Sequence, residues 1–292
     1  MPAPPVGQTY VDVAAGPGHS LALTSGGQVI AWGGGDNGNG ETTVPAPPPG
    51  HRYTAIAAGE GYSLALTSGG QVVAWGYNGN GRTTVPAPPE GQTYTAIAAG
   101  GRHALALTSG GQVVAWGFSA DGQTTVPAPP AGQRYTAIAA GYVHSLALTS
   151  GGQVVAWGQN VSGMVTVPAL PAGQKYTAIA ASYAHSLALT SGGQVVGWGF
   201  NADGQTTVPQ PPAGQTYTAV AVGAAFSLAL TSGGQVVAWG QNGAGQATVP
   251  SLLSGMVYTD IAAGYWHGLA IASDRPVSES PGSLSGAFGS LS

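Results

Sequence analysis

The sequence predicts an all-β protein, a seven-bladed β-propeller built from repeats of about 41 residues. Two periodic features carry this prediction, and no segment shows the apolar period of a helix. Trp-Gly pairs begin at Trp32, Trp75, Trp116, Trp157, Trp198 and Trp239. A tyrosine followed by small residues, "YTAIAAG" in most copies, begins at Tyr10, Tyr53, Tyr94, Tyr135, Tyr176, Tyr217 and Tyr258. Seven copies of one unit therefore predict a single propeller over residues 1–273.

Each unit contains four short segments with strand character. In the copy that starts at Tyr135 these are "YTAIAAG", "HSLALT", "QVVAWG" and the segment that reads "TTVP" in most copies. Gly, Ser, Asn and Pro separate them, as turns require. The small residues of "AIAAG" suit the innermost strand, where blades converge on the axis. The proline of "TTVP" suits the outer edge, where a missing N–H costs least. The prediction is therefore four strands per blade.

The seventh repeat departs from this pattern. "YTDIAAGYWHGLAIASD", from Tyr258, holds two recognisable strands and then runs into residues 274–292. This tail is rich in Ser and Gly and matches neither missing strand, so we expect it to be disordered. The last blade is then incomplete, and the ring closes on inner strands only or borrows a strand from elsewhere. Self-association through this blade is left open.

Composition excludes several function classes. Six Lys and Arg against ten Asp and Glu give a net charge of −4 without a basic patch, so no nucleic-acid partner is expected. No apolar run is long enough to span a membrane, which predicts no membrane insertion. No signal peptide opens the chain, and the residues alone leave localisation unknown. The absence of cysteine excludes a disulfide framework.

The copies differ from one another mainly at two joins. The join between the first two strands reads PGH, EGY, GRH, YVH, YAH, AAF and YWH, and the segment after Trp-Gly varies as widely. The joins "TSGGQ" and "VPAPPAGQ" hardly change. In an up-and-down blade the first and third turns lie at one end of the strands. Both variable joins are therefore predicted on one face of the disc, and both constant joins on the other.

The residues in the variable joins suggest what this face does. Aromatic rings on one face of a disc are typical of a protein-binding surface. The alternative is that Tyr77, Phe118 and Phe200 cover edges between blades, and that Asp121 and Asp203, each before Gly, form turns. Four acidic residues fall on the same face, with Arg102 for contrast, so this aromatic face is expected to be mildly acidic: Asp36, Glu60, Asp121 and Asp203. The candidate partner-binding residues are Glu60, Tyr62, Tyr77, Arg102, Phe118, Asp121, Tyr142, Tyr183, Phe200, Asp203, Phe226, Tyr265 and Trp266.

Catalytic and metal chemistry is not indicated. Five histidines occupy equivalent positions on five different blades, and Tyr62 and Phe226 replace them on the other two. A packing role tolerates such replacement whereas a ligand role does not, so we interpret these histidines as structural. The sequence predicts no catalytic residue, no metal and no cofactor, and the protein is not expected to be an enzyme. An enzyme that uses the axial cavity is the less favoured alternative. The five histidines interpreted as structural are His19, His103, His144, His185 and His267.

The repeat "AAGYVHSLALTSGGQVVAWGQN" resembles the regulator-of-chromosome-condensation repeat, in which a strand containing His precedes an aliphatic strand ending in Trp-Gly. The segments "GETTVPA" at 40–46 and "GQTTVPA" at 122–128 are similar to those of the bacterial β-lactamase inhibitory proteins that are propellers of this type. The resemblance implies a secreted inhibitor that caps an enzyme's active site. Its partner would be a β-lactamase, or a cell-envelope protein. The alternative is a cell-surface or structural repeat domain, natural or consensus-designed, whose partner is unrelated.

Overall fold

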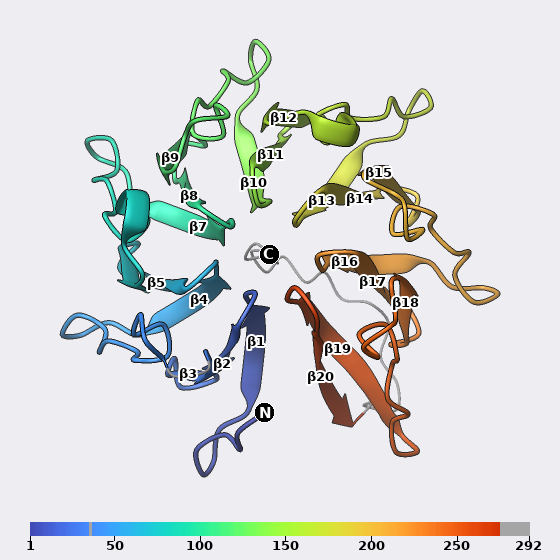
Figure 1. Cartoon of the computed structure of the whole chain (residues 1–292), viewed down its shortest axis with the longest axis horizontal. Coiled ribbons are helices and arrows are strands. Elements are labelled where there is room, and N and C mark those ends of the chain that lie inside the picture. Colours follow the sequence, from blue (N-terminus) through green and yellow to red (C-terminus); the bar gives the residue numbers. More distant parts are fainter. Residues whose placement is uncertain (35–36, 275–292) are drawn as a thin grey trace.

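Seven antiparallel sheets surround a central axis in the order of the chain (Figure 1). The computed structural model describes residues 1–34 and 37–274. The expectations for Asp36 and for the tail from 275 to 292 lie outside the described residues. Within these residues six sheets have three strands and the seventh has two, which confirms the all-β propeller and the prediction that the last blade has fewer strands than the others. Within the described ranges, no helix is long and apolar enough to cross a membrane.

Each blade is ordered from the axis outward. The inner strands are β1 (Tyr10–Ala15), β4 (Tyr53–Ala58), β7 (Tyr94–Ala99), β10 (Tyr135–Ala140), β13 (Tyr176–Ala181), β16 (Tyr217–Val222) and β19 (Met256–Ala263). The middle strands are β2 (His19–Thr24), β5 (Tyr62–Thr67), β8 (His103–Thr108), β11 (His144–Thr149), β14 (His185–Thr190), β17 (Phe226–Thr231) and β20 (Gly268–Asp274). The outer strands are β3 (Val29–Gly33), β6 (Val72–Gly76), β9 (Val113–Gly117), β12 (Val154–Gly158), β15 (Val195–Gly199) and β18 (Val236–Gly240). Two short 3₁₀ turns, η1 (Gly79–Gly81) and η2 (Val161–Gly163), follow β6 and β12.

The repeated tyrosine fixes how one blade leads into the next. In every blade its ring hydroxyl donates to a proline carbonyl eight residues earlier, as Tyr135 does to Pro127 at 2.8 Å. A bulge follows the tyrosine, and the small residues beyond it, such as Ala139, are fully buried near the axis. Small side chains are needed because seven strands converge there.

The "TTVP" segment does not form a fourth strand, so the prediction of four strands per blade was wrong. The carbonyl just before this segment bonds to the next blade instead. The Gln123 carbonyl accepts hydrogen bonds from the indole of Trp157 at 2.9 Å and from the hydroxyl of Ser145 at 2.9 Å. The segment therefore joins neighbouring blades, and its proline costs no ladder hydrogen bond.

The seams between blades share one polar contact. At five of the seven seams, a histidine Nε2 lies 2.8–2.9 Å from a serine Oγ of the next blade. The last of these pairs, His267 with Ser20, closes the ring between blade seven and blade one. Val13, Ala22 and Ala262 pack together at the same seam. Among the described residues, inner and middle strands supply these closing contacts.

The other two seams have a larger ring paired with a smaller partner residue. Tyr62 replaces histidine in blade two, and Ala104 replaces serine in blade three. The Tyr62 hydroxyl donates to the His103 carbonyl of blade three at 2.6 Å. The small side chain of Ala104 leaves room for the tyrosine ring there. Phe226 and Gly268 form the second such pair, between blades six and seven. Where a larger ring replaces the histidine of one blade, alanine or glycine replaces the serine of the next blade.

Two half-buried aspartates flank the seam that closes the ring. Asp12 and Asp260 occupy a position that holds alanine in the other five blades. Burial, together with the nearby charge of Asp260, raises the pKa of Asp12 to about 8. Burial also raises the pKa of Asp260, to about 6. These carboxyls favour the protonated form in the folded state, so their ionisation costs stability as the pH rises.

Replacing Asp12 by asparagine is therefore expected to stabilise the protein at alkaline pH. The stability that a protonated Asp12 contributes is complete below its unfolded pKa of about 4 and is lost as the pH rises toward 8. Asp12→Asn should raise the free energy of unfolding by about 1–3 kcal/mol at pH 8, and by less at pH 6. Urea titrations at the two pH values measure this. A gain that is the same at both would contradict the raised pKa.

Candidate partner-binding face

Backbone hydrogen bonds bring the two variable joins together on one face of the disc. The N–H of Tyr77, which follows β6, donates to the Gly61 carbonyl between β4 and β5 at 2.7 Å. Phe118 bonds to Arg102 in the same way at 2.9 Å, as does Phe200 to Ala184. We call this the loop face: residues 16–18, 59–61, 100–102, 141–143, 182–184, 223–225 and 264–266, with the described segments that follow each Trp-Gly pair. The constant joins pair with one another at the opposite ends of the strands, as Ser68 does with Arg52.

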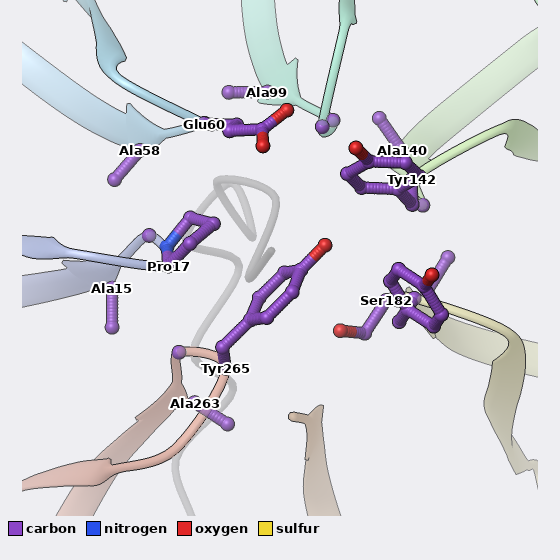
Figure 2. Close-up of a pocket in the computed structure, with 18 residues that line it drawn as sticks. Ala15, Pro17, Ala58, Glu60, Ala99, Ala140, Tyr142, Ser182, Ala263 and Tyr265 are labelled. Atoms are coloured by element: carbon purple, nitrogen blue, oxygen red, sulfur yellow. The ribbon is translucent and has the colours of Figure 1, made fainter. Parts of the chain in front are cut away.

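Four rings from blades four, five and seven meet on the loop face. The ring centroid of Tyr142 lies 5.0 Å from that of Tyr183, and Tyr265 lies 5.6 Å from Tyr183 and 6.3 Å from Tyr142. Trp266 packs edge-on against Tyr265 at 6.4 Å. These four residues are the aromatic cluster. In Figure 2 the Tyr265 side chain projects toward the axis, between Pro17, Glu60 and Tyr142.

The axial cavity beneath the cluster is very small. Its volume is about 30 Å³, and alanines and glycines from six blades surround it, as the ring of alanines in Figure 2 shows. That volume holds about one water molecule. The Tyr265 hydroxyl at its mouth is buried without a hydrogen-bond partner, and burial raises the pKa of this tyrosine. A cavity of this size, as the described residues line it, does not hold an organic substrate.

An apolar groove lies beside the aromatic cluster. Its volume is about 730 Å³, and Val161, Met164 and Phe200 line it together with Tyr142, Tyr183, Tyr265 and Trp266. Asp203 is the acidic residue in its lining. Several large apolar side chains of the loop face are exposed: Trp266 at 55%, Tyr77 at 47%, Tyr183 at 46% and Phe200 at 40%. Three of these four line the groove, which makes it the main apolar surface of this face.

The opposite half of the loop face is polar. Glu60 lies 3.9 Å from the guanidinium of Arg82 and 3.7 Å from that of Arg102, so its charge is balanced. The Arg82 guanidinium also lies 4.9 Å from the ring centroid of Tyr77. The Arg102 guanidinium is 5.3 Å from the Tyr142 centroid and 5.9 Å from that of Phe118. Arg82 was not among the predicted site residues, although its position differs from that in every other copy, where the residues are Glu41, Gln123, Met164, Gln205 and Gln246.

Two predicted site residues do not belong to this surface. Tyr62 and Phe226 are both 0% exposed, because their rings pack into the seam with the next blade. They cannot touch a partner of the folded protein, so their inclusion in the candidate site was wrong. Asp121 is half-buried and accepts a hydrogen bond from the Gln159 side chain at 3.3 Å. The other predicted residues reach the surface, Phe118 and Arg102 near the polar half and Asp203 at the apolar groove.

The histidines lie beneath the loop face. His103, His144 and His185 are fully buried, with each Nε2 on a serine hydroxyl and each Nδ1 without a partner. Burial lowers the pKa of His103 and of His185 to about 3 and that of His144 to about 4. Among the described residues, no three His, Cys, Asp or Glu side chains are grouped so that they could hold a metal ion. The histidines pack between blades, as their interpretation as structural residues requires.

Fold and loop face together define a repeat propeller whose variable side chains are gathered on one face. The repeat model described as "Regulator of chromosome condensation (RCC1) repeat" matches residues 10–41, 53–82, 94–123, 135–163, 176–205 and 217–246. The chain belongs to this repeat family. No curated protein matches it.

Solved structures share the fold at low sequence identity. Prp20p from Saccharomyces cerevisiae, described with its binding properties to Gsp1p and histones, is 22% identical with a TM-score of 0.78, over 92% of this chain and 83% of that one. Human WBSCR16 is 20% identical with a TM-score of 0.78, over 92% and 88%. The ectodomain of the Physcomitrella patens receptor kinase CR4 is 23% identical with a TM-score of 0.67, over 88% and 69%. These likenesses concern the fold alone.

Proposed function

We propose that the protein binds another protein through its loop face, with the aromatic cluster and the apolar groove as the centre of contact. The observation that carries this proposal is that Tyr183, Phe200 and Trp266 are all exposed around one groove. Large rings on a surface leave apolar area in water, and burying them in an interface removes that cost. Tyr and Trp are also the residues that most often supply binding energy at interfaces.

Two kinds of protein partner are proposed for the loop face. The resemblance of "GETTVPA" and "GQTTVPA" to β-lactamase inhibitory propellers makes a β-lactamase the first partner to test. In that role the aromatic cluster would cover the rim of the enzyme's active site. A cell-envelope protein is the second partner to test. Partner binding also agrees with what is described for Prp20p, which binds Gsp1p and histones.

Replacing Trp266 by alanine should weaken binding of the partner about thirtyfold or more, which corresponds to about 2 kcal/mol for a central aromatic residue. The loss should come mainly from faster dissociation. Asp203→Ala should instead slow association and reduce its dependence on salt, because an exposed charge at the edge of an interface acts over distance. The measurement is surface-immobilised binding kinetics against a panel of purified β-lactamases and of cell-envelope proteins.

Matched controls lie on the opposite face. Gln153 and Lys175 are exposed next to the constant joins, and their replacement by alanine should leave the affinity unchanged. If these changes abolish binding and Trp266→Ala does not, the loop face is not the binding face. If the loop-face variants bind as the unmodified protein does to every β-lactamase that it recognises, the inhibitor-like role fails. A partner among the envelope proteins that does depend on Trp266 would still support the loop face.

A further inference from the structure

Among the described residues, the two-stranded seventh blade leaves one strand edge open. In blades one to six, the middle strand has a neighbour on each side and all six of its residues are buried. In blade seven, β20 pairs only with β19 among the described residues, and Leu269, Ala270 and Ile271 are half-exposed. An edge strand with free N–H and C=O groups is a template for pairing with another chain. The backbone of β20 is therefore prepared to accept a strand.

A groove lies along this open blade. Its volume is about 340 Å³, and its walls come from blades six and seven. Leu228, Val236, Ile261 and Leu269 give it an apolar lining, and the buried Gln246 stands at its polar part. This groove is separate from the apolar groove of the loop face, although Trp266 contributes to both. A site lined in this way selects an apolar strand.

Beside the open edge of β20 lies the space that a third strand would fill, which we call the gap. Two polar groups that border the gap lack, among the described residues, the partners that their equivalents have in the other blades. At five seams the outer-strand tryptophan donates to a carbonyl of the preceding blade at 2.7–2.9 Å. The equivalent carbonyl of blade six belongs to Gln246, and in the described chain it accepts no indole. The indole of Trp32, on the other side of the gap, has no such carbonyl among the described residues. This side chain is half-buried, whereas the other five outer-strand tryptophans are buried.

We propose that this gap binds an extended segment of a second polypeptide, with the pattern aliphatic–aliphatic–small–Trp–Gly followed by a turn, which completes blade seven by adding a strand to β20. The contacts of the outer strands in the intact blades indicate which contacts the added strand would make. The aliphatic pair covers the apolar lining, and the tryptophan donates to the Gln246 carbonyl. A carbonyl in the turn accepts from Trp32. Glycine is required after the tryptophan, because Gly240 has φ +92° and a Cβ there would lie 2.6 Å from the Ala225 carbonyl.

The probe that tests this is a synthetic peptide with the sequence of residues 232–249, "SGGQVVAWGQNGAGQATV", the blade-six segment that has no counterpart in the described part of blade seven. We expect the full chain to bind it in isothermal titration calorimetry and to melt at a higher temperature with it. Trp239→Ala within the peptide should weaken binding about thirtyfold. Gly240→Val within the peptide should abolish it. Changes made in the peptide leave the folding of the protein untouched.

Trp32 supplies a second readout. A peptide with Trp239→Phe carries no indole, so any change in emission comes from the protein. The bound peptide should shift the tryptophan emission to the blue, and the shift should be smaller in the Trp32→Phe protein, which keeps only the part from Trp266 in the groove. A peptide that ends at residue 241 lacks the turn, so its shift should be the same in the Trp32→Phe protein and in the unmodified one. Tyr183→Ala, which alters the loop face only, should leave peptide binding unchanged, so the test is independent of the proposed function.

Three outcomes would overturn the proposal. The first is no binding and no change in melting temperature at millimolar peptide. The second is a dimer in sedimentation that the peptide does not dissociate, which would assign the edge to a second copy of this chain. The third is binding that appears only after residues 275–292 are removed, which would assign the gap to the chain's own C-terminal segment. Binding with the stated dependence on Trp239 and Gly240 supports it.

Discussion

Acidification from pH 7.5 to about 5 is expected to unfold the protein cooperatively. The folded-state pKa values of His19, His103, His144 and His185 are lowered to between about 3 and about 4, mainly by burial. The ordinary value in the unfolded chain is about 6.5. The stability that each neutral histidine contributes is thus complete above pH 6.5 and is lost as the pH falls toward its folded pKa. At pH 5 each costs about 2 kcal/mol.

The hydrogen bonds explain why these histidines resist protonation. The Ser145 hydroxyl donates its only proton to the Gln123 carbonyl at 2.9 Å, so it must accept from Nε2–H of His103. The proton of the neutral ring is then on Nε2, and an added proton must go to Nδ1. That atom is buried without a partner. A charge formed there has no compensation, which is costly in a protein interior.

The expected loss is comparable with the stability of a typical domain. Protonation of the four histidines costs about 8 kcal/mol in total, which lies within the range of about 5–15 kcal/mol that most domains have. Protonation of Asp12 offsets part of this. Circular dichroism and tryptophan emission, followed from pH 7.5 to 4, should show one transition near pH 5. A protein that keeps its sheet signal at pH 4 would contradict the neutral, buried state of these side chains.

The chain itself suggests the matched control. The double variant His144→Phe with Ser186→Gly copies the pair formed by Phe226 and Gly268 at another seam. It removes one titrating group without leaving a serine hydroxyl unpaired. We expect its stability at pH 5 to exceed that of the unmodified protein by about 2 kcal/mol relative to the difference at pH 7.5. An unchanged acid transition would show that other groups cause it.

Replacing Trp157 by alanine is expected to lower the free energy of unfolding by about 3–5 kcal/mol. Its ring is buried among Ala98, Leu107 and Ile138 of the neighbouring strands, and its indole donates to Gln123. The variant loses this packing and leaves the Gln123 carbonyl with the Ser145 hydroxyl alone. Urea unfolding monitored by circular dichroism measures the change.

Trp32→Ala is the internal comparison for that measurement. Trp32 ends β3 at the same place in its blade, but it is half-buried and, in the part of the chain that is described, makes no indole hydrogen bond. Its replacement should cost less than half as much as Trp157→Ala. Equal losses would mean that position in the blade, and not burial between blades, determines the contribution of these tryptophans. A loss below about 1 kcal/mol for Trp157 would rule out its role in the core.

The sequence was sufficient for the architecture because the repeat is regular and each strand has its own composition. The alanines of β10 and the Trp-Gly at the end of β12 are local signals, and their period gives the number of blades. The "TTVP" segment misled because proline at a strand edge and proline outside any strand look the same in sequence. Its true role depends on a hydrogen bond from Trp157, which belongs to the next repeat.

The candidate site was predicted less well, for a similar reason. Position within a join predicted which side chains lie on the loop face, but not which of them reach solvent. Tyr62 was grouped with Tyr77 because both are aromatic and lie in variable joins, yet only Tyr77 is exposed. The signal that separates them lies in the following repeat, where Ala104 stands in place of serine. Burial at a seam can be inferred only from two copies together.

The residue pairs at the seams also determine which edits of the repeat number the ring can accept. A histidine must meet a serine, and a larger ring must meet alanine or glycine, so each blade has one donor side and one acceptor side. Removing blade four would place His103 against Ser186, which is a matched pair. Removing blade two would place His19 against Ala104, which leaves a buried imidazole without its partner. Blades of nearly identical sequence are therefore interchangeable only in some orders, and gain or loss of repeats by recombination is permitted at some junctions and penalised at others.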